Sequence, residues 1–267
     1  MDALRAAVRD VFHVAATRLV PLHGGDLSDV TRIDLDDGRT VVAKEGPMVA
    51  CEGRMLEAIA ATGMPAPRVL GLAGTVLFLE ALDETRAEPL HWPRFGEDLA
   101  RMHATPGAGY GWPEDYAFGP VAIPNAAAAD WPGFWAERRL LPFLPHLPSR
   151  LAARVEALAR RLPDLLPAAP RPGLLHGDLW GGNLLPTTDA IHLIDPACYH
   201  GDGEVDLAML HLFGSPGPGF YEGYGALAPG WEQRRAAYSL FPALVHVRLF
   251  GAGYHGMVER FLSAAGA

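Results

Sequence analysis

The sequence predicts an α+β fold in which an N-terminal antiparallel sheet precedes a mainly helical C-terminal part. A hairpin is predicted over residues 22–44, because alternating apolar and polar residues flank the turn Asp36-Asp37-Gly38. The apolar run at residues 75–80 predicts a further strand. Beyond it, helical periodicity returns repeatedly up to Leu262, so helices should dominate the rest of the chain.

Helix start and stop signals divide the chain further. Pro21 lies just beyond an amphipathic stretch at the N-terminus, and Gly63 and Pro65 follow another. Helices are therefore predicted over residues 2–19, 48–62, 95–103, 131–139, 149–166 and about 231–262, with a shorter helix that reaches Phe213. The stretch between Thr105 and Trp131 is rich in Gly, Pro and aromatic residues, and we expect it to cover or line a substrate cleft.

Bulk composition limits the possible functions. The chain has 267 residues and is 49% hydrophobic, which permits one large domain or two lobes. With 22 basic and 31 acidic residues, its net charge of -9 argues against nucleic acid or an anionic membrane as the main partner and suits a cationic substrate. No apparent signal peptide or membrane span occurs, and Cys51 and Cys198 form neither a disulfide framework nor a zinc motif. We therefore expect a cytoplasmic protein.

The segment His176-Gly-Asp-Leu-Trp-Gly-Gly-Asn183 is the strongest chemical motif. Its His, Asp, Leu and Asn have the spacing of the protein-kinase catalytic loop H-R-D-L-x-x-x-N, and Asp195, at the end of a later apolar run, takes the place of the Asp in D-F-G. Phosphoryl transfer needs a carboxylate near the acceptor hydroxyl and oxygen ligands for magnesium. We therefore predict Asp178 as the catalytic base and Asn183 and Asp195 as magnesium ligands. A capped, solvated loop is the alternative, but four matched positions disfavour it.

Candidate phosphate-binding residues lie upstream of this loop. Gly24 and Gly25 could bring backbone amides to phosphate oxygens, with Ser28 as a further donor, although paired glycines more often mark only a turn. Lys44, in Val-Val-Ala-Lys, is similar to the kinase V-A-I-K lysine that binds the α- and β-phosphates. Glu52 on the following helix is the candidate partner of Lys44, with Glu57 as its rival.

Other residues are assigned by their place relative to these motifs. Leu79, Glu80, Ala81 and Leu82 follow the strand at 75–80, where a bilobal kinase-like fold would present backbone groups to adenine. His176 and Trp180 lie within two residues of Asp178 and are candidate substrate contacts, although Trp180 could equally belong to the core. His103 is interpreted as a helix-terminal histidine, and Asp206 either braces the catalytic loop or caps a helix.

With these motifs, the chain resembles the fructosamine kinase, or ketosamine kinase, family, within the aminoglycoside phosphotransferase and choline kinase-like superfamily. The resemblance covers almost the whole chain. It rests on the segments Leu174–Asn183, Ile194–Ala197, Gly203–Ala208, Leu99–His103, Tyr110–Trp112 with Phe118-Gly119, and Trp131 with Phe134-Trp135.

The resemblance implies a kinase-like fold, with a small nucleotide-binding lobe at residues 1–82 and a larger catalytic and substrate-binding lobe at 83–267. It also implies ATP and Mg²⁺ as cofactors and, as substrate, a free or protein-bound ketosamine whose sugar is phosphorylated so that the amine is released. Another sugar or amino-alcohol kinase of the superfamily, for example an aminoglycoside kinase, is the alternative. A nucleotide-binding pseudokinase is disfavoured because Lys44, Asp178, Asn183 and Asp195 are all intact. The oligomeric state stays open.

Overall fold

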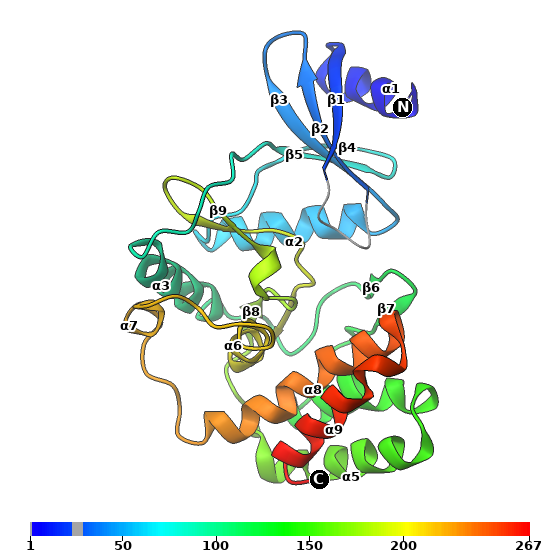
Figure 1. The fold of residues 1–267 in the computed structure, drawn as a ribbon, viewed down its shortest axis with the longest axis vertical. Helices are drawn as coiled ribbons and strands as arrows, with labels where there is room; N and C mark the ends of the chain where they lie inside the picture. The colour runs from blue at the N-terminus through cyan, green and yellow to red at the C-terminus, as the bar shows by residue number, and fades with distance from the viewer. Residues whose placement is uncertain (1, 23–28) are drawn as a thin grey trace.

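A computed structural model describes residues 2–22 and 29–267, which form a smaller and a larger lobe, one above the other in Figure 1. The candidate phosphate-binding residues Gly24, Gly25 and Ser28 lie outside the described residues. The predicted α+β architecture is confirmed, because a five-stranded antiparallel sheet makes up most of the smaller lobe and helices make up most of the larger one.

The sheet of the smaller lobe has the strand order β1-β2-β3-β5-β4, with every neighbouring pair antiparallel. Its strands are β1 (Ala16–Leu22), β2 (Asp29–Leu35), β3 (Thr40–Glu45), β4 (Val69–Ala73) and β5 (Val76–Glu80), and its helices are α1 (Asp2–Phe12) and α2 (Val49–Ala61). The predicted hairpin is β2–β3, and Gly38 in its turn has φ +86°, a conformation that favours glycine.

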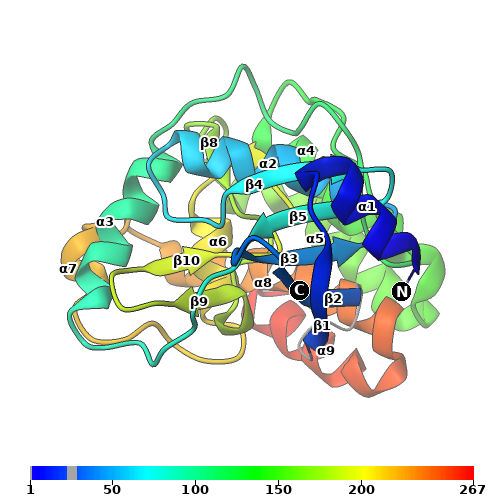
Figure 2. The same cartoon turned by 90° about the horizontal axis from the view of Figure 1, so that it is seen from above.

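The two helices of this lobe pack on opposite faces of the sheet, because each belongs to a different core cluster. Figure 2 shows this lobe and its strands from above. Side chains of a strand alternate between faces. In β5, Phe78 therefore packs in the cluster that contains α1, whereas Leu77 and Leu79 pack in the cluster that contains α2. This packing fixes α2 beneath the sheet, next to the end of β3 that carries Lys44.

The predicted helix over residues 2–19 was wrong in its second half. The helix ends at Phe12, His13 has φ +60°, and Ala16–Leu22 is a strand paired with β2. Apolar residues of a short strand also fit one side of a helical period, so the pattern alone does not separate the two. Pairing with the β2–β3 hairpin satisfies the backbone of this segment in the sheet.

The larger lobe contains seven α-helices, four 3₁₀- or π-helical turns and three small strand pairs among the described residues. The helices are α3 (His91–His103), α4 (Trp131–Trp135), α5 (Ser149–Leu165), α6 (Glu204–Leu210), α7 (Phe220–Tyr224), α8 (Trp231–Phe250) and α9 (His255–Ala264). The turns are η1 (Ala136–Leu140), η2 (Leu141–His146), η3 (Gly181–Asn183) and η4 (Ala252–Tyr254). The strand pairs are β6 (Tyr116–Phe118) with β7 (Val121–Ile123), β8 (Gly173–Leu175) with β11 (Tyr199–Gly201), and β9 (Leu184–Pro186) with β10 (Ile191–Leu193).

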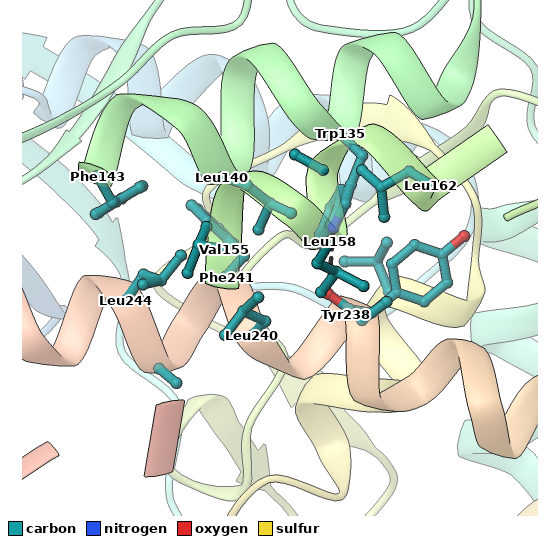
Figure 3. Close-up of a cluster of buried hydrophobic side chains, with 14 of the residues drawn as sticks. Trp135, Leu140, Phe143, Val155, Leu158, Leu162, Tyr238, Leu240, Phe241 and Leu244 are labelled. Atoms are coloured by element: carbon teal, nitrogen blue, oxygen red, sulfur yellow. Dashed lines mark hydrogen bonds between the residues drawn. The ribbon is translucent and has the colours of Figure 1, made fainter. Parts of the chain in front are cut away.

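The largest core cluster lies among α4, α5, α8 and η1, and Figure 3 shows part of it. Arg139 is completely buried within this cluster, with its guanidinium carbon 4.1 Å from the ring centroid of Tyr199. Its charge is balanced by cation–π contacts and by a 2.7 Å hydrogen bond to the carbonyl of Pro124. The core thereby holds β11, which pairs with β8 just before the predicted catalytic loop.

No helix in the described part of the chain combines the length and the apolar character needed to cross a membrane.

Candidate active site

A cleft of about 1900 Å³ is lined by residues of both lobes. Its lining includes the predicted chemical residues Lys44, Glu52, Asp178, Asn183 and Asp195. These residues come from β3, α2 and the segment between β8 and β11, which are far apart in the sequence. The fold therefore brings together the side chains that the kinase-like motifs singled out.

Lys44 is held by two carboxylates. Its ammonium nitrogen lies 2.6 Å from an oxygen of Glu52 and 2.7 Å from Oδ1 of Asp195. Burial alone would lower the pKa of Lys44, but the charges of Glu52 and Asp195 raise it above the usual value. The predicted pairing with Glu52 is confirmed as a contact, whereas the rival Glu57 is exposed on the same helix.

Asp178 lies in the tight loop between β8 and η3. The amide nitrogen of Asn183 donates to the backbone carbonyl of Asp178 at 2.8 Å and to its Oδ2 at 3.0 Å. Burial raises the pKa of Asp178 to about 7; the hydrogen bond from Asn183 opposes the shift, and the nearby charge of Asp195 adds to it. A carboxylate with a pKa near neutrality is suited to accept a hydroxyl proton.

The loop needs glycine before Asp178. Gly177 has φ +80°, and a Cβ there would lie 2.1 Å from the carbonyl oxygen of Ala197. A side chain at this position would therefore push apart the two segments that carry Asp178 and Asp195. The amide of Ala197 also donates to the carbonyl of His176 at 2.8 Å, which fixes the same two segments side by side.

Asp195 is positioned by the β9–β10 hairpin. Leu193 pairs with Leu184, and the next residue, Ile194, donates its amide to the carbonyl of Asn183 at 3.1 Å. Asp195 itself has φ +55°, a left-handed conformation that is uncommon outside glycine and that asparagine and aspartate tolerate best. The hairpin register and this backbone conformation bring Asn183 and Asp195 into the lining of the same cleft.

Asp206 braces the catalytic loop, one of the two roles predicted from the sequence. Its carboxylate is fully buried and accepts hydrogen bonds from the backbone amides of His176, at 2.7 Å, and Gly177, at 2.9 Å. His103 Nε2 lies 3.1 Å from the same carboxylate, and Tyr224 lies 2.9 Å from the other ring nitrogen. Burial alone would raise the pKa of Asp206, but the hydrogen bond and charge of His103 outweigh it, so the pKa is lowered.

His176 is a structural part of this loop. Its side chain is completely buried, and Nε2 lies 2.9 Å from the carbonyl of Ile194 while Nδ1 accepts from the amide of Asp178. Both ring nitrogens are therefore used within the protein, and burial lowers the pKa of His176, which favours the neutral ring. The expected substrate contact of His176 does not fit this position, and we assign the residue a positioning role instead.

The donor set fits a magnesium ion. Asn183 and Asp195 provide an amide oxygen and a carboxylate, the hard oxygen ligands that Mg²⁺ takes together with water and substrate phosphates. No group of three or more His, Cys, Asp or Glu side chains in residues 2–22 and 29–267 could hold a metal alone. A metal bound here would therefore complete its coordination with phosphate oxygens and water.

The remaining predicted residues lie around the same cleft. Leu79, Glu80 and Leu82 line it, and Ala81 continues from β5 into the segment between the lobes; adenine contact at these four residues stays a prediction. Trp180 is 38% exposed and lines the cleft beside Asp178, so it does not belong to the core.

Sequence reasoning missed two contributors. His103 was interpreted as a helix-terminal residue, although it holds the carboxylate that braces the loop; no local pattern links it with Asp206, which is 103 positions further on. Tyr116 was treated only as part of a long loop. It begins the β6–β7 hairpin, lines the cleft, and has a pKa raised by burial and by the charges of Glu52 and Asp195. The prediction that the 105–131 stretch lines a cleft is confirmed.

The fold and this arrangement of side chains define a protein kinase-like phosphotransferase. A family model described as fructosamine kinase matches residues 4–265, and the chain belongs to the fructosamine kinase family. It is thus an enzyme that transfers a phosphoryl group to a sugar hydroxyl.

Relatives and solved structures agree with this assignment. A Thermus thermophilus protein named a probable ketoamine kinase is 37% identical over 275 residues, which cover 99% of this chain and 100% of the relative. The structure of a Thermobifida fusca protein provisionally named a fructosamine-3-kinase has a TM-score of 0.93 at 32% identity, with 99% of each chain covered. An amicoumacin kinase, solved with AMP-PNP and Ca²⁺, has a TM-score of 0.69 at 15% identity, with 99% of this chain and 92% of that chain covered, and shows a shared fold alone.

The ion pair predicts unequal roles for two glutamates of α2. Replacing Glu52 with Gln removes one of the two charges that hold Lys44, so the lysine loses its fixed place and kcat/KM for ATP should fall by roughly 10-fold to 100-fold. Steady-state kinetics measure this change. The exposed Glu57→Gln variant is the matched control and should match the wild type; equal losses in both variants would refute the assigned pairing.

The Asp206 network predicts a pH-dependent contribution to stability. Because the pKa of Asp206 is lower in the folded state, its carboxylate stabilises the fold at neutral pH, and this contribution disappears as the pH falls through that lowered value, below about pH 4. Asp206→Asn should lower the free energy of unfolding at pH 7 by roughly 1–3 kcal/mol, since a buried backbone amide loses its acceptor.

Urea denaturation at pH 7 and at pH 3.5 measures this difference. The variant and the wild type should differ less at the lower pH, because the wild type begins there to lose the carboxylate contribution that the variant lacks at both pH values. Asp189→Asn, on an exposed turn, serves as the control. A difference that is the same at both pH values would contradict the charged state assigned to Asp206.

Proposed function

We propose that the chain is an ATP- and Mg²⁺-dependent ketosamine kinase that acts in deglycation. Its substrate would be the adduct of a ketose with a free amine or a protein lysine, and phosphorylation of the sugar would make the adduct labile so that the amine is released. Membership of the fructosamine kinase family and the name of the Thermus thermophilus relative support this substrate class. The observation that carries the proposal is the carboxylate of Asp178, which has a pKa near 7 and lines the same cleft as Lys44 and Asp195.

Each side chain of the site has a distinct task in this reaction. Asp178 accepts the proton of the attacking sugar hydroxyl. Lys44 binds the α- and β-phosphates, and Glu52 keeps its ammonium group in place. Asn183 and Asp195 would hold the magnesium ion, which neutralises charge on the transferred phosphate.

The position of Asp195 next to Lys44 also suits phosphoryl transfer. The two groups lie 2.7 Å apart, so a metal held by Asp195 and the phosphates bound by Lys44 would be neighbours. Asn183 touches Asp178 on the other side of the site. The amide of Ile194, next to Asp195, donates to the carbonyl of Asn183, so these contacts connect Lys44 to Asp178 through the backbone of the two segments. They would hold the groups in the order that in-line attack by the hydroxyl requires.

We propose a cytoplasmic location for this reaction. Both cysteines, Cys51 and Cys198, are free and buried, as is usual for proteins of a reducing compartment.

ADP release tests the proposed reaction. Purified enzyme with ATP and Mg²⁺ should turn over fructosyl-lysine or ribulosyl-lysine, but not a free ketose or an aminoglycoside. Asp178→Asn should reduce kcat by about 100-fold or more, because the base is lost, while ATP affinity changes little. Asp164 is exposed on α5, so Asp164→Asn makes the same substitution away from the site and serves as the control.

Turnover of the aminoglycoside and of no other acceptor would still support a kinase but would rule out ketosamines as its substrates. ATP binding without turnover of any acceptor would favour a pseudokinase. Undiminished turnover in the Asp178→Asn variant would remove this residue from the mechanism.

A further inference from the structure

The cleft continues beyond the base along a wall of aromatic rings. We define the aromatic wall as Trp180, Phe213, His246, Phe250 and Tyr254, all of which line the cleft. Neighbouring ring centroids are 6.0 Å apart for Trp180 and Phe213, 5.3 Å for Phe213 and His246, and 5.5 Å for His246 and Phe250. Tyr254 closes the group, with its ring centroid 4.9 Å from that of His246. The wall therefore begins two residues after Asp178 and runs along the C-terminal half of α8.

These rings are exposed to a degree that is unusual for their size. Trp180 is 38% exposed, and Phe213 and Phe250 are each 49% exposed. The other large apolar side chains classed as exposed in the described part of the chain are leucines, so every aromatic one belongs to this wall. Exposed apolar surface that is gathered in one patch next to a catalytic group marks a binding surface more often than chance exposure does.

Charge is distributed unevenly around the cleft. Among the described lining residues from Tyr116 onward, the only carboxylates are those of Asp178 and Asp195, and none is a lysine or arginine. The other charged lining residues come from the smaller lobe and the segment that follows β5: Asp29, Arg32, Lys44, Glu45, Glu52, Glu80, Asp83 and Glu84. A ligand group against the aromatic wall would thus find π-faces and apolar side chains but no cation to neutralise a carboxylate.

The geometry of the reaction determines which part of a substrate reaches this wall. Lys44 marks the phosphate side of the cleft, and Asp178 marks the position of the acceptor hydroxyl. A ketosamine whose sugar lies at Asp178 must extend its amine and the amine's substituent away from the nucleotide. Trp180 lies two residues after Asp178, and the neighbouring rings continue the cleft lining from it along the larger lobe.

We propose that the aromatic wall is the subsite for the amine-derived part of the substrate. It selects ketosamines of aromatic or large apolar amines over those of small, carboxylate-bearing amines such as glycine. The rings pack against the apolar substituent, and the face of Trp180 next to the base stabilises the protonated secondary amine. A lysine side chain of a protein is compatible with this subsite through its apolar stem, whereas a carboxylate close to the amine is disfavoured because it is desolvated without a partner. This inference rests on the proposed ketosamine kinase function.

Three fructose adducts that differ only in the amine test the subsite: those of benzylamine, methylamine and glycine. We expect kcat/KM to be about 10-fold or more higher for the benzylamine adduct than for the methylamine adduct, the scale of discrimination that an apolar pocket gives. The glycine adduct should be the poorest of the three. Phe213→Ala and Phe250→Ala should each reduce the ratio of benzylamine to methylamine adduct several-fold.

Leu90→Ala is the matched control, since Leu90 is 72% exposed and is not among the residues that line the cleft. This variant should keep the wild-type ratio, and thermal melting checks that all three variants fold. A wild-type ratio of benzylamine to methylamine adduct near one, or a ratio that is unchanged in both phenylalanine variants, would overturn the subsite. Turnover of the adducts would in either case still support the kinase assignment. The glycine adduct reacting best would also overturn it. Absence of turnover with every ketosamine would instead overturn the proposed function on which the subsite depends.

Discussion

The site depends on a lysine ammonium buried between two carboxylates from different lobes. Lys44 lies on β3, Glu52 on α2 of the same lobe, and Asp195 on the segment after β10 of the other lobe. A buried cation is costly unless its charge is matched, so this contact constrains where the sheet, α2 and the catalytic segment lie relative to one another. The order of the groups across the cleft follows from it: Lys44, then Asp195, then the side-chain amide of Asn183 and the carboxylate of Asp178.

A second buried charge determines the shape of the catalytic loop. Asp206 accepts two backbone amides of the His176-Gly177 turn and is itself held by His103. The loop is therefore held by a buried side chain from outside it as well as by the β8–β11 pair. This division lets Asp178 be both fixed in place and partly accessible, because Asp206 holds the loop from the interior while Asp178 lines the cleft.

The parts of the fold that local patterns predicted are those with local causes. The β2–β3 hairpin follows from alternation and from Gly38, and the end of α2 follows from Gly63. The catalytic spacing from His176 to Asn183 was recognisable because one short loop carries several groups that act together. The pairing of Lys44 with Glu52 was predicted from kinase-like order. The strand β1 was misread because Leu19 continues the helical spacing of apolar residues that begins at Leu4.

Other features arise only when distant segments meet. The burial of Arg139 is one of them, because α8 and the β8–β11 pair enclose this arginine in aromatic rings. His103 and Asp206 belong to different helices, and the aromatic wall joins the catalytic loop to the end of α8 and η4. No period or spacing in the sequence connects these residues, so tertiary packing alone determines these contacts.

A crystal structure with Mn²⁺, a non-hydrolysable ATP analogue and a fructosyl amine tests the central claim most directly. We predict an anomalous Mn²⁺ peak coordinated by Asn183 and Asp195, with Lys44 still paired to Glu52 and a sugar hydroxyl within hydrogen-bond distance of Asp178. A metal bound away from these ligands, or a sugar whose hydroxyls lie out of reach of Asp178, would contradict it.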